Sequence, residues 1–214
     1  MRHFSVNTPP NFCLLDRESP RYAREAYRDY VTEQQPYEVV RECDGYELRR
    51  YPSCVVAEVA VDADFDQAGS IAFRPLVNYI GGNNSARTSL DMTAPVVQSR
   101  KMSMTAPVVQ QAGADRQQVI AFVLPANVAL DLAPTPIDPR VVVREVPASL
   151  TAVSRFSGRW SEASYLQHVE DLQKAITADG LTAVSEPRFA RFDPPFKPWF
   201  LRRNEVHIDV AHRD

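Results

Sequence analysis

This sequence of 214 residues lacks the features that would place it in a membrane, outside the cell or on a nucleic acid. It has no run of 18 apolar residues, so no membrane-spanning helix is expected. Its net charge of −3 gives no basic excess for a nucleic-acid partner. The N-terminus lacks the apolar core of a secretory signal, and the three cysteines form no CxxC pair. These absences favour reduced thiols and a cytoplasmic protein.

Catalytic signatures are missing as well. The chain contains no GxSxG turn, no Walker loop and no HExxH motif, and Gly81-Gly82 follows a helix pattern instead of forming a phosphate loop. Of the four histidines, only His168 lies beside a predicted helix core, so no local metal motif results. No pair of acidic residues has a spacing that implies a general acid and base. We therefore expect a protein that is not an enzyme.

The composition is that of a globular domain with one core. Hydrophobic residues make up 44% of the chain and charged residues 24%. Residues 1–35 contain Pro9-Pro10 and a weakly apolar charged segment, which predicts a partly helical N-terminal leader. A single domain is expected at 36–212.

Alternation of apolar and polar residues predicts a strand-rich domain with two helices. The predicted helices are Phe65–Ile80, which ends at Gly81-Gly82, and Glu162–Ala178, which Ser161 caps. The predicted strands are Tyr37–Cys43, Tyr46–Tyr51, Ser53–Val61, Gln118–Leu124, Arg140–Val146, Leu150–Phe156, Ala183–Phe192 and Arg203–Val210.

The first predicted helix is apolar on two sides. One stripe begins at Phe65, and a second consists of Phe73, Val77 and Ile80. A helix of this kind must be covered on most sides. Either protein or a bound apolar ligand could provide the second cover.

Two repeats suggest how the domain is organised. MTAPVVQ occurs at 92–98 and again at 104–110, and predicts an extra hairpin at 90–110 with Ser99–Lys101 as its connection. Because Pro95 and Pro107 lack an N–H, these strands should be edge strands or carry bulges. We expect Met104 to belong to the core fold and Met92 to lie exposed or at a lip. The methionines suit either a plain hairpin or the rim of a ligand groove.

The second repeat is VVRE, at 39–42 and 142–145. Each copy opens a succession of strand, strand and helix, which predicts two pseudo-symmetric halves. A cleft between such halves is a natural ligand site.

The segment FDPPFKPWFLRRNEV at 192–206 is rich in prolines and aromatics, with Lys197 among its cations. It suits a rigid crossover packed on the core. It equally suits an apolar wall for a flat molecule that carries carboxylates. Glu205, in a predicted strand, should pair with a cation or contact a ligand if it points inward.

Several stretches together carry a family resemblance. They are GYELRRYPSCVVAEV, RPLVNYIGGNN, KMSMTAPV, VIAFVLP with the PTPIDPRV that follows, and FDPPFKPWFLRRNEV. In this order, over 37–210, they resemble the SOUL/haem-binding protein family. The resemblance implies an α+β fold: a distorted antiparallel β-barrel of two pseudo-symmetric sheet halves with two flanking helices. The fold is also similar to gyrase-inhibitor-like ligand-binding domains.

The resemblance also implies a function, which is the binding of haem or related tetrapyrroles in a hydrophobic groove along the first helix, as carrier or buffer. Phe73, Arg74 and Val77 would line the tetrapyrrole, Met104 could roof it, and Arg74 and Lys197 would meet its propionates. CxxCH is absent, so the haem would be held non-covalently. His168 is either a flank residue or an iron ligand.

Two other functions compete with this one. The alternative is the binding of other small hydrophobic or cationic molecules through a pocket that contains Glu205. A hydrolase or tetrapyrrole-modifying enzyme is the third possibility. The sequence does not set the oligomeric state.

Overall fold

One curved antiparallel sheet carries both helices in the computed structural model, which describes residues 33–100, 117–194 and 196–212. Its main path runs β2-β3-β8-β11-β10-β5-β6-β4-β7, β1 pairs with β5, and β9 pairs with β11. The strands are β1 (Glu33–Gln34), β2 (Glu38–Cys43), β3 (Tyr46–Tyr51), β4 (Cys54–Asp62), β5 (Thr93–Arg100), β6 (Gln117–Val123), β7 (Val141–Val146), β8 (Ser149–Phe156), β9 (Leu181–Ala183), β10 (Arg188–Arg191) and β11 (Asn204–His212).

The prediction of an α+β fold with an antiparallel sheet and two helices is confirmed. All strand pairs on the main path are antiparallel, and β1 joins β5 in parallel. Within the described residues, the ladder ends at β2 on one side and at β7 on the other. The predicted barrel is therefore an open, curved sheet that hydrogen bonds do not close.

The helices are α2 (Phe65–Ile80) and α3 (Glu162–Ala178), with the predicted bounds. The Oγ of Ser161 accepts a hydrogen bond from the Ser164 amide at 3.4 Å and caps α3. At the start of α2, the side chain of the N-cap residue Asp64 makes no capping hydrogen bond. A 3₁₀ turn, Trp199–Leu201, lies in the connection between β10 and β11.

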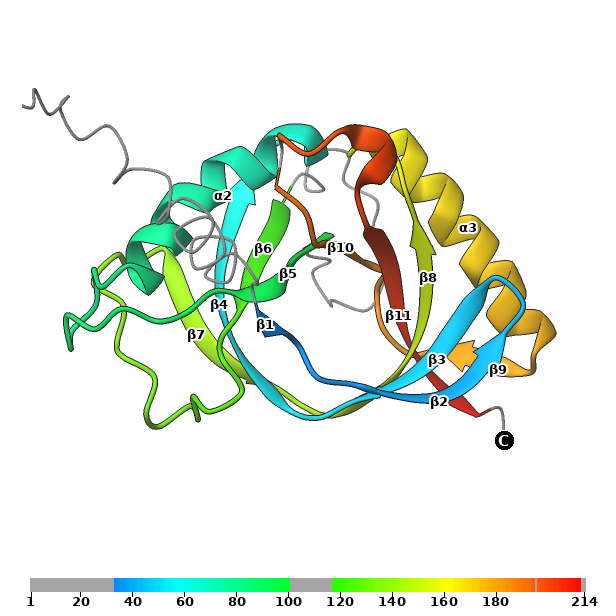
Figure 1. The fold of residues 1–214 in the computed structure, drawn as a ribbon, viewed down its shortest axis with the longest axis horizontal. Helices are drawn as coiled ribbons and strands as arrows, with labels where there is room; N and C mark the ends of the chain where they lie inside the picture. Colours follow the sequence, from blue (N-terminus) through cyan, green and yellow to red (C-terminus); the bar gives the residue numbers. More distant parts are fainter. Residues whose placement is uncertain (1–32, 101–116, 195, 213–214) are drawn as a thin grey trace, which may run out of the picture. The chain divides into compact units, whose positions relative to one another are not determined.

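Both helices cover the same side of the sheet, which we call the helix face (Figure 1). Leu76 and Tyr79 of α2 pack on β4, β6 and β7 in one core cluster. Leu172 and Ile176 of α3 pack on a second cluster, formed by β3, β8 and β11. Side chains alternate along each strand, so every second residue points to the opposite side, which we call the cavity face.

The two halves of the sheet are related by a shift of 95 residues. Tyr51 pairs with Ser149 between β3 and β8, and Cys54 pairs with Val146 between β4 and β7. Val146 lies 95 positions after Tyr51, and Ser149 lies 95 after Cys54. Each pair of strands turns at an X-Pro bend and leads into a helix. The equivalent strands are thus β3 with β7 and β4 with β8.

The predicted equivalence of the two VVRE copies is therefore wrong. The copies lie 103 residues apart, in β2 and β7. These are the two ends of the described main path. One more strand separates β2 from its helix than separates β7 from its helix. The shared motif marks edge strands, where exposed charges discourage pairing with another chain.

The first MTAPVVQ copy is a central strand and not an added hairpin. It lies in β5, between β10 and β6. Ser99 and Arg100 extend that strand, so they do not form the predicted connection. Met92, expected to be exposed or lip-forming, is half-buried against the helix-face core. The register shift between Thr93 and Val96 confirms the bulge predicted at Pro95. The second copy, with Met104, lies outside the described residues.

Candidate functional site

The outer flank of α2 is graded from buried to exposed. Its main stripe is covered by the sheet, whereas Phe73 is 48% exposed and Val77 is half-buried against the core. The Phe73 ring meets Phe122 of β6 edge-on, at 5.6 Å between centroids. Arg74, the next residue, is exposed. Phe73, Val77 and Arg74 therefore offer an apolar strip with a cation beside it.

Lys197 lies in the connection between β10 and β11 and already has a partner. Its Nζ is 2.6 Å from Asp193 Oδ1, and the Arg203 amide donates to the same carboxylate. The tip of this connection is strongly apolar, with Phe196 83% exposed and Trp199 about half exposed. The role of Lys197 toward a propionate stays a prediction.

Glu205 is fully buried on the cavity face and is bonded to three side chains. Arg49 approaches both carboxylate oxygens, at 3.0 and 3.3 Å. Arg203 donates to Oε1 at 2.7 Å, and His207 lies 2.9 Å from Oε2. Glu205 therefore points inward, which is the case in which the sequence predicts a cationic partner, and Arg49 and Arg203 are such partners. Because its charge is already matched, Glu205 leaves little room for a ligand cation, and its role as a ligand contact stays a prediction.

This network shifts the ionisation of its members in opposite ways. Burial alone would raise the pKa of Glu205, but hydrogen bonding and charge from His207, together with Arg49, hold that pKa at about 2. Burial lowers the pKa of His207, and Glu205 opposes the shift only in part. Burial also raises the pKa of Tyr51, which stacks on His207, to about 12. At neutral pH the network therefore contains an ionised carboxylate and a neutral tyrosine.

His168 lies on α3 and stacks on Phe156, with 3.8 Å between ring centroids. Burial lowers the pKa of His168, with Asp171 acting in the opposite direction. Phe156 belongs to the helix-face core under α3, so this histidine lies against the other half of the sheet from Phe73. Among the described residues, no three His, Cys, Asp or Glu side chains converge to hold a metal ion.

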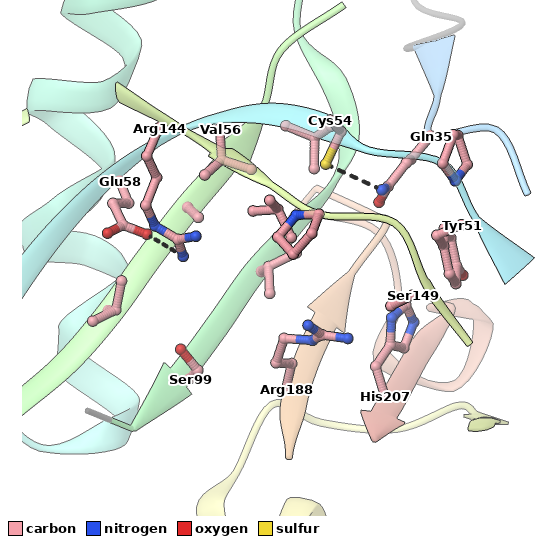
Figure 2. A pocket seen from close by; sticks show the side chains of 17 residues that line it. Gln35, Tyr51, Cys54, Val56, Glu58, Ser99, Arg144, Ser149, Arg188 and His207 are labelled. Atoms are coloured by element: carbon pink, nitrogen blue, oxygen red, sulfur yellow. Dashed lines mark hydrogen bonds and ion pairs between the residues drawn. The ribbon is translucent and has the colours of Figure 1, made fainter. Parts of the chain in front are cut away.

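The structure shows a cavity of about 100 Å³ on the cavity face, partly open to solvent (Figure 2). It lies between the two equivalent X-Pro bends, and Pro52 and Pro147 both line it. Its apolar wall consists of Val56, Val97, Val119, Ala121, Val123 and Val146. Arg188 and His207 lie at one end, and Glu58 and Arg144 at the other (Figure 2).

Some polar groups of this cavity have hydrogen-bond or ion-pair partners of good geometry, and others do not. Arg188 pairs with Asp209, and the Cys54 thiol accepts from Gln35 Nε2 at 3.4 Å. Burial raises the pKa of that thiol, which keeps it protonated at neutral pH. Glu58 Oε2 lies 2.9 Å from an Arg144 nitrogen but has no hydrogen bond of good geometry.

The sequence reasoning missed this cavity, although one signal was present. Glu58 is the one charged residue within the apolar run Cys54–Val61. Cys54, Val56 and Glu58 are alternate residues of this run. A carboxylate at such a position points to the same face as its apolar neighbours. That signal identifies a half-buried acid but not the strands that surround it.

Together, fold and site define an α+β protein with two helices on one face of a curved sheet and a small cavity on the other. The model of the SOUL heme-binding protein family matches residues 32–209, so the chain belongs to this family. Heme-binding protein 1 of Xenopus tropicalis is 27% identical over 168 residues, which cover 77% of this chain and 84% of that protein. No helix of the described part is long and apolar enough to cross a membrane.

Solved structures of low sequence identity share the fold. The C-terminal domain of EcmrR superposes with a TM-score of 0.58 at 12% identity, over 83% of this chain and 99% of that one. A hydrolase from Listeria innocua superposes with a TM-score of 0.51 at 14% identity, over 89% and 98%. At these identities the likeness concerns the fold alone.

Proposed function

We propose that this protein binds haem or a related tetrapyrrole, without converting it, on the outer flank of α2. Family membership over 32–209 carries the choice of ligand. The exposed Phe73 ring, beside Val77 and Arg74, supports the choice of site, because a tetrapyrrole needs an apolar surface for its ring and a cation for its carboxylates. The donor set of this flank fits the ring and propionates of haem, but it contains no histidine or cysteine to bind the iron.

Binding through apolar contact makes the protein a carrier or buffer in our proposal, because the ligand could then be released without breaking a bond to iron. Cys43 and Cys54 are both free thiols. Reduced thiols support the further proposal of a cytoplasmic location.

A haemin titration tests the ligand. We expect a shifted Soret band that saturates near one equivalent of haemin per chain. A linear, unsaturated rise like that of nonspecific uptake would contradict the proposal.

A pair of matched variants tests the site. Phe73 and Ile71 are each 48% exposed on α2, but they lie on different flanks of the helix. Phe73→Asp should weaken haemin binding roughly tenfold or more, because a charge enters the apolar contact. Ile71→Asp should leave it unchanged. Equal effects of the two variants would move the site away from this flank.

A second pair tests the propionate contact. Arg74→Glu should repel the carboxylates and weaken binding several-fold, with a larger effect at low salt. Lys174→Glu changes an exposed helix cation of α3 and should have no effect. If both variants bind haemin like the wild type, Arg74 does not contact the ligand.

A further inference from the structure

The cavity face holds a carboxylate whose charge is only loosely matched. Glu58 lines the cavity, and its side chain is 19% exposed. Within the part of the chain that the structure describes, its ion-pair partner is Arg144, whose side chain is 50% exposed. An arginine that lies half in water can leave the contact at small cost, because exposed ion pairs contribute little.

One atom of this carboxylate lacks a hydrogen bond. Glu58 Oε2 is buried, and its 2.9 Å contact with Arg144 has poor geometry for donation. Buried acceptors are normally satisfied, and a carboxylate oxygen is satisfied best by a charged N–H donor. The cavity therefore presents an acceptor that a ligand could complete.

The two basic residues at the other end of the cavity have acidic partners within the chain. Arg188 is paired with Asp209, and His207 with Glu205. An anionic ligand would have to break one of these pairs and also lie near Glu58. A cationic ligand needs only to displace Arg144 toward solvent.

We propose that this cavity binds a small organic amine, with its ammonium group on Glu58 and its apolar body against the valine wall. The volume of about 100 Å³ limits the ligand to one ring or a short alkyl chain. Pockets for drug-sized ligands enclose roughly 300–1,000 Å³. The site is on the opposite face of the sheet from the α2 flank, so it is independent of the tetrapyrrole site.

Three probes of one shape test the choice of charge. Benzylammonium, benzyl alcohol and benzoate are titrated into the full chain, and binding is followed by calorimetry and by amide chemical shifts in β4, β6 and β7. Benzylammonium should bind at least about tenfold more tightly than benzyl alcohol, which lacks the charge. Benzoate should not bind. Preferred binding of benzoate, or equal binding of all three, would overturn the proposal.

Three substitutions test the residue. Glu58→Gln should weaken benzylammonium binding at least about tenfold, whereas Glu145→Gln, an exposed carboxylate on the other side of β7, should not change it. Arg144→Gln should strengthen binding, because it removes the internal cation that competes for Glu58. A purely structural role for the pair predicts weakening or no change in Arg144→Gln, and either result would reject the site. Haemin binding should be unaffected by all three variants.

Discussion

Arg49 and Arg144 occupy equivalent positions in the two halves of the sheet, 95 residues apart, yet their surroundings are opposite. Arg49 is 2% exposed and forms two bonds to Glu205, which is completely buried. Arg144 is half exposed and meets Glu58 through one loose contact. Both point to the cavity face. We call the half of the sheet around Arg49 and Glu205 the filled side, because its charges are buried and paired. We call the half around Arg144 and Glu58 the open side.

The neighbours of each arginine explain the difference. Tyr51 and its equivalent Val146 both line the cavity. The Tyr51 ring is buried and stacks on His207, and its hydroxyl accepts a hydrogen bond from Arg49. The much smaller side chain of Val146 is only half-buried. A large aromatic side chain therefore closes one half, and a small aliphatic one leaves the other open. The comparison suggests that the filled side stabilises the fold while the open side is available to ligands.

The largest expected effect comes from breaking the filled side. Arg49→Met leaves a buried carboxylate short of one cation, and should lower the free energy of unfolding by about 3–5 kcal/mol. Arg144→Met removes an exposed pair and should cost less than about 1 kcal/mol. Urea unfolding followed by tryptophan fluorescence measures both. Similar losses in the two variants would remove the distinction between the sides.

Acid should weaken the filled side next. The pKa of Glu205 is about 2 in the folded protein against an ordinary 4.5. Because the folded pKa is the lower one, this stabilisation is complete above about pH 4.5 and is lost as the pH falls toward 2. The loss amounts to roughly 3 kcal/mol, at 1.36 kcal/mol per pKa unit.

Glu205→Gln provides the check on this pH window. The variant should be less stable than the wild type at pH 7, since Arg49 and Arg203 lose their common partner. Its unfolding free energy should fall less steeply between pH 4.5 and 2. Parallel curves for wild type and variant would show that Glu205 does not carry the acid sensitivity.

Local signals were sufficient to predict the helices and most strands. Both helices have the predicted bounds because apolar periodicity, Ser161 and the glycines after each helix act within a few residues. These features depend on short-range stereochemistry, which the sequence contains directly.

Strand order could not be predicted in the same way. Arg49 and Glu205 are separated by 156 residues, and nothing local states that β3 and β11 both flank β8. For the same reason two identical VVRE motifs suggested the wrong repeat, and the first MTAPVVQ copy was misread as an added hairpin. Sequence identity between segments does not reveal which strands they pair with.

The smallest expected change in stability, and the sharpest test of the comparison, comes from closing the open side with the residue of the filled one. Val146→Tyr introduces the equivalent of Tyr51 into the cavity, which has room for part of the ring and an opening for the hydroxyl. Because the added atoms enter open space, stability should change by less than about 1 kcal/mol, below the usual cost of overpacking a filled core. Benzylammonium binding should be lost, while haemin binding on the α2 flank should remain.

Val143→Tyr is the control on the same strand: Val143 points to the helix face, where it packs against the core. That substitution should cost roughly 1–3 kcal/mol, because its ring must enter filled space. If Val146→Tyr costs as much as Val143→Tyr, the cavity is not open space, and the two sides differ only in charge.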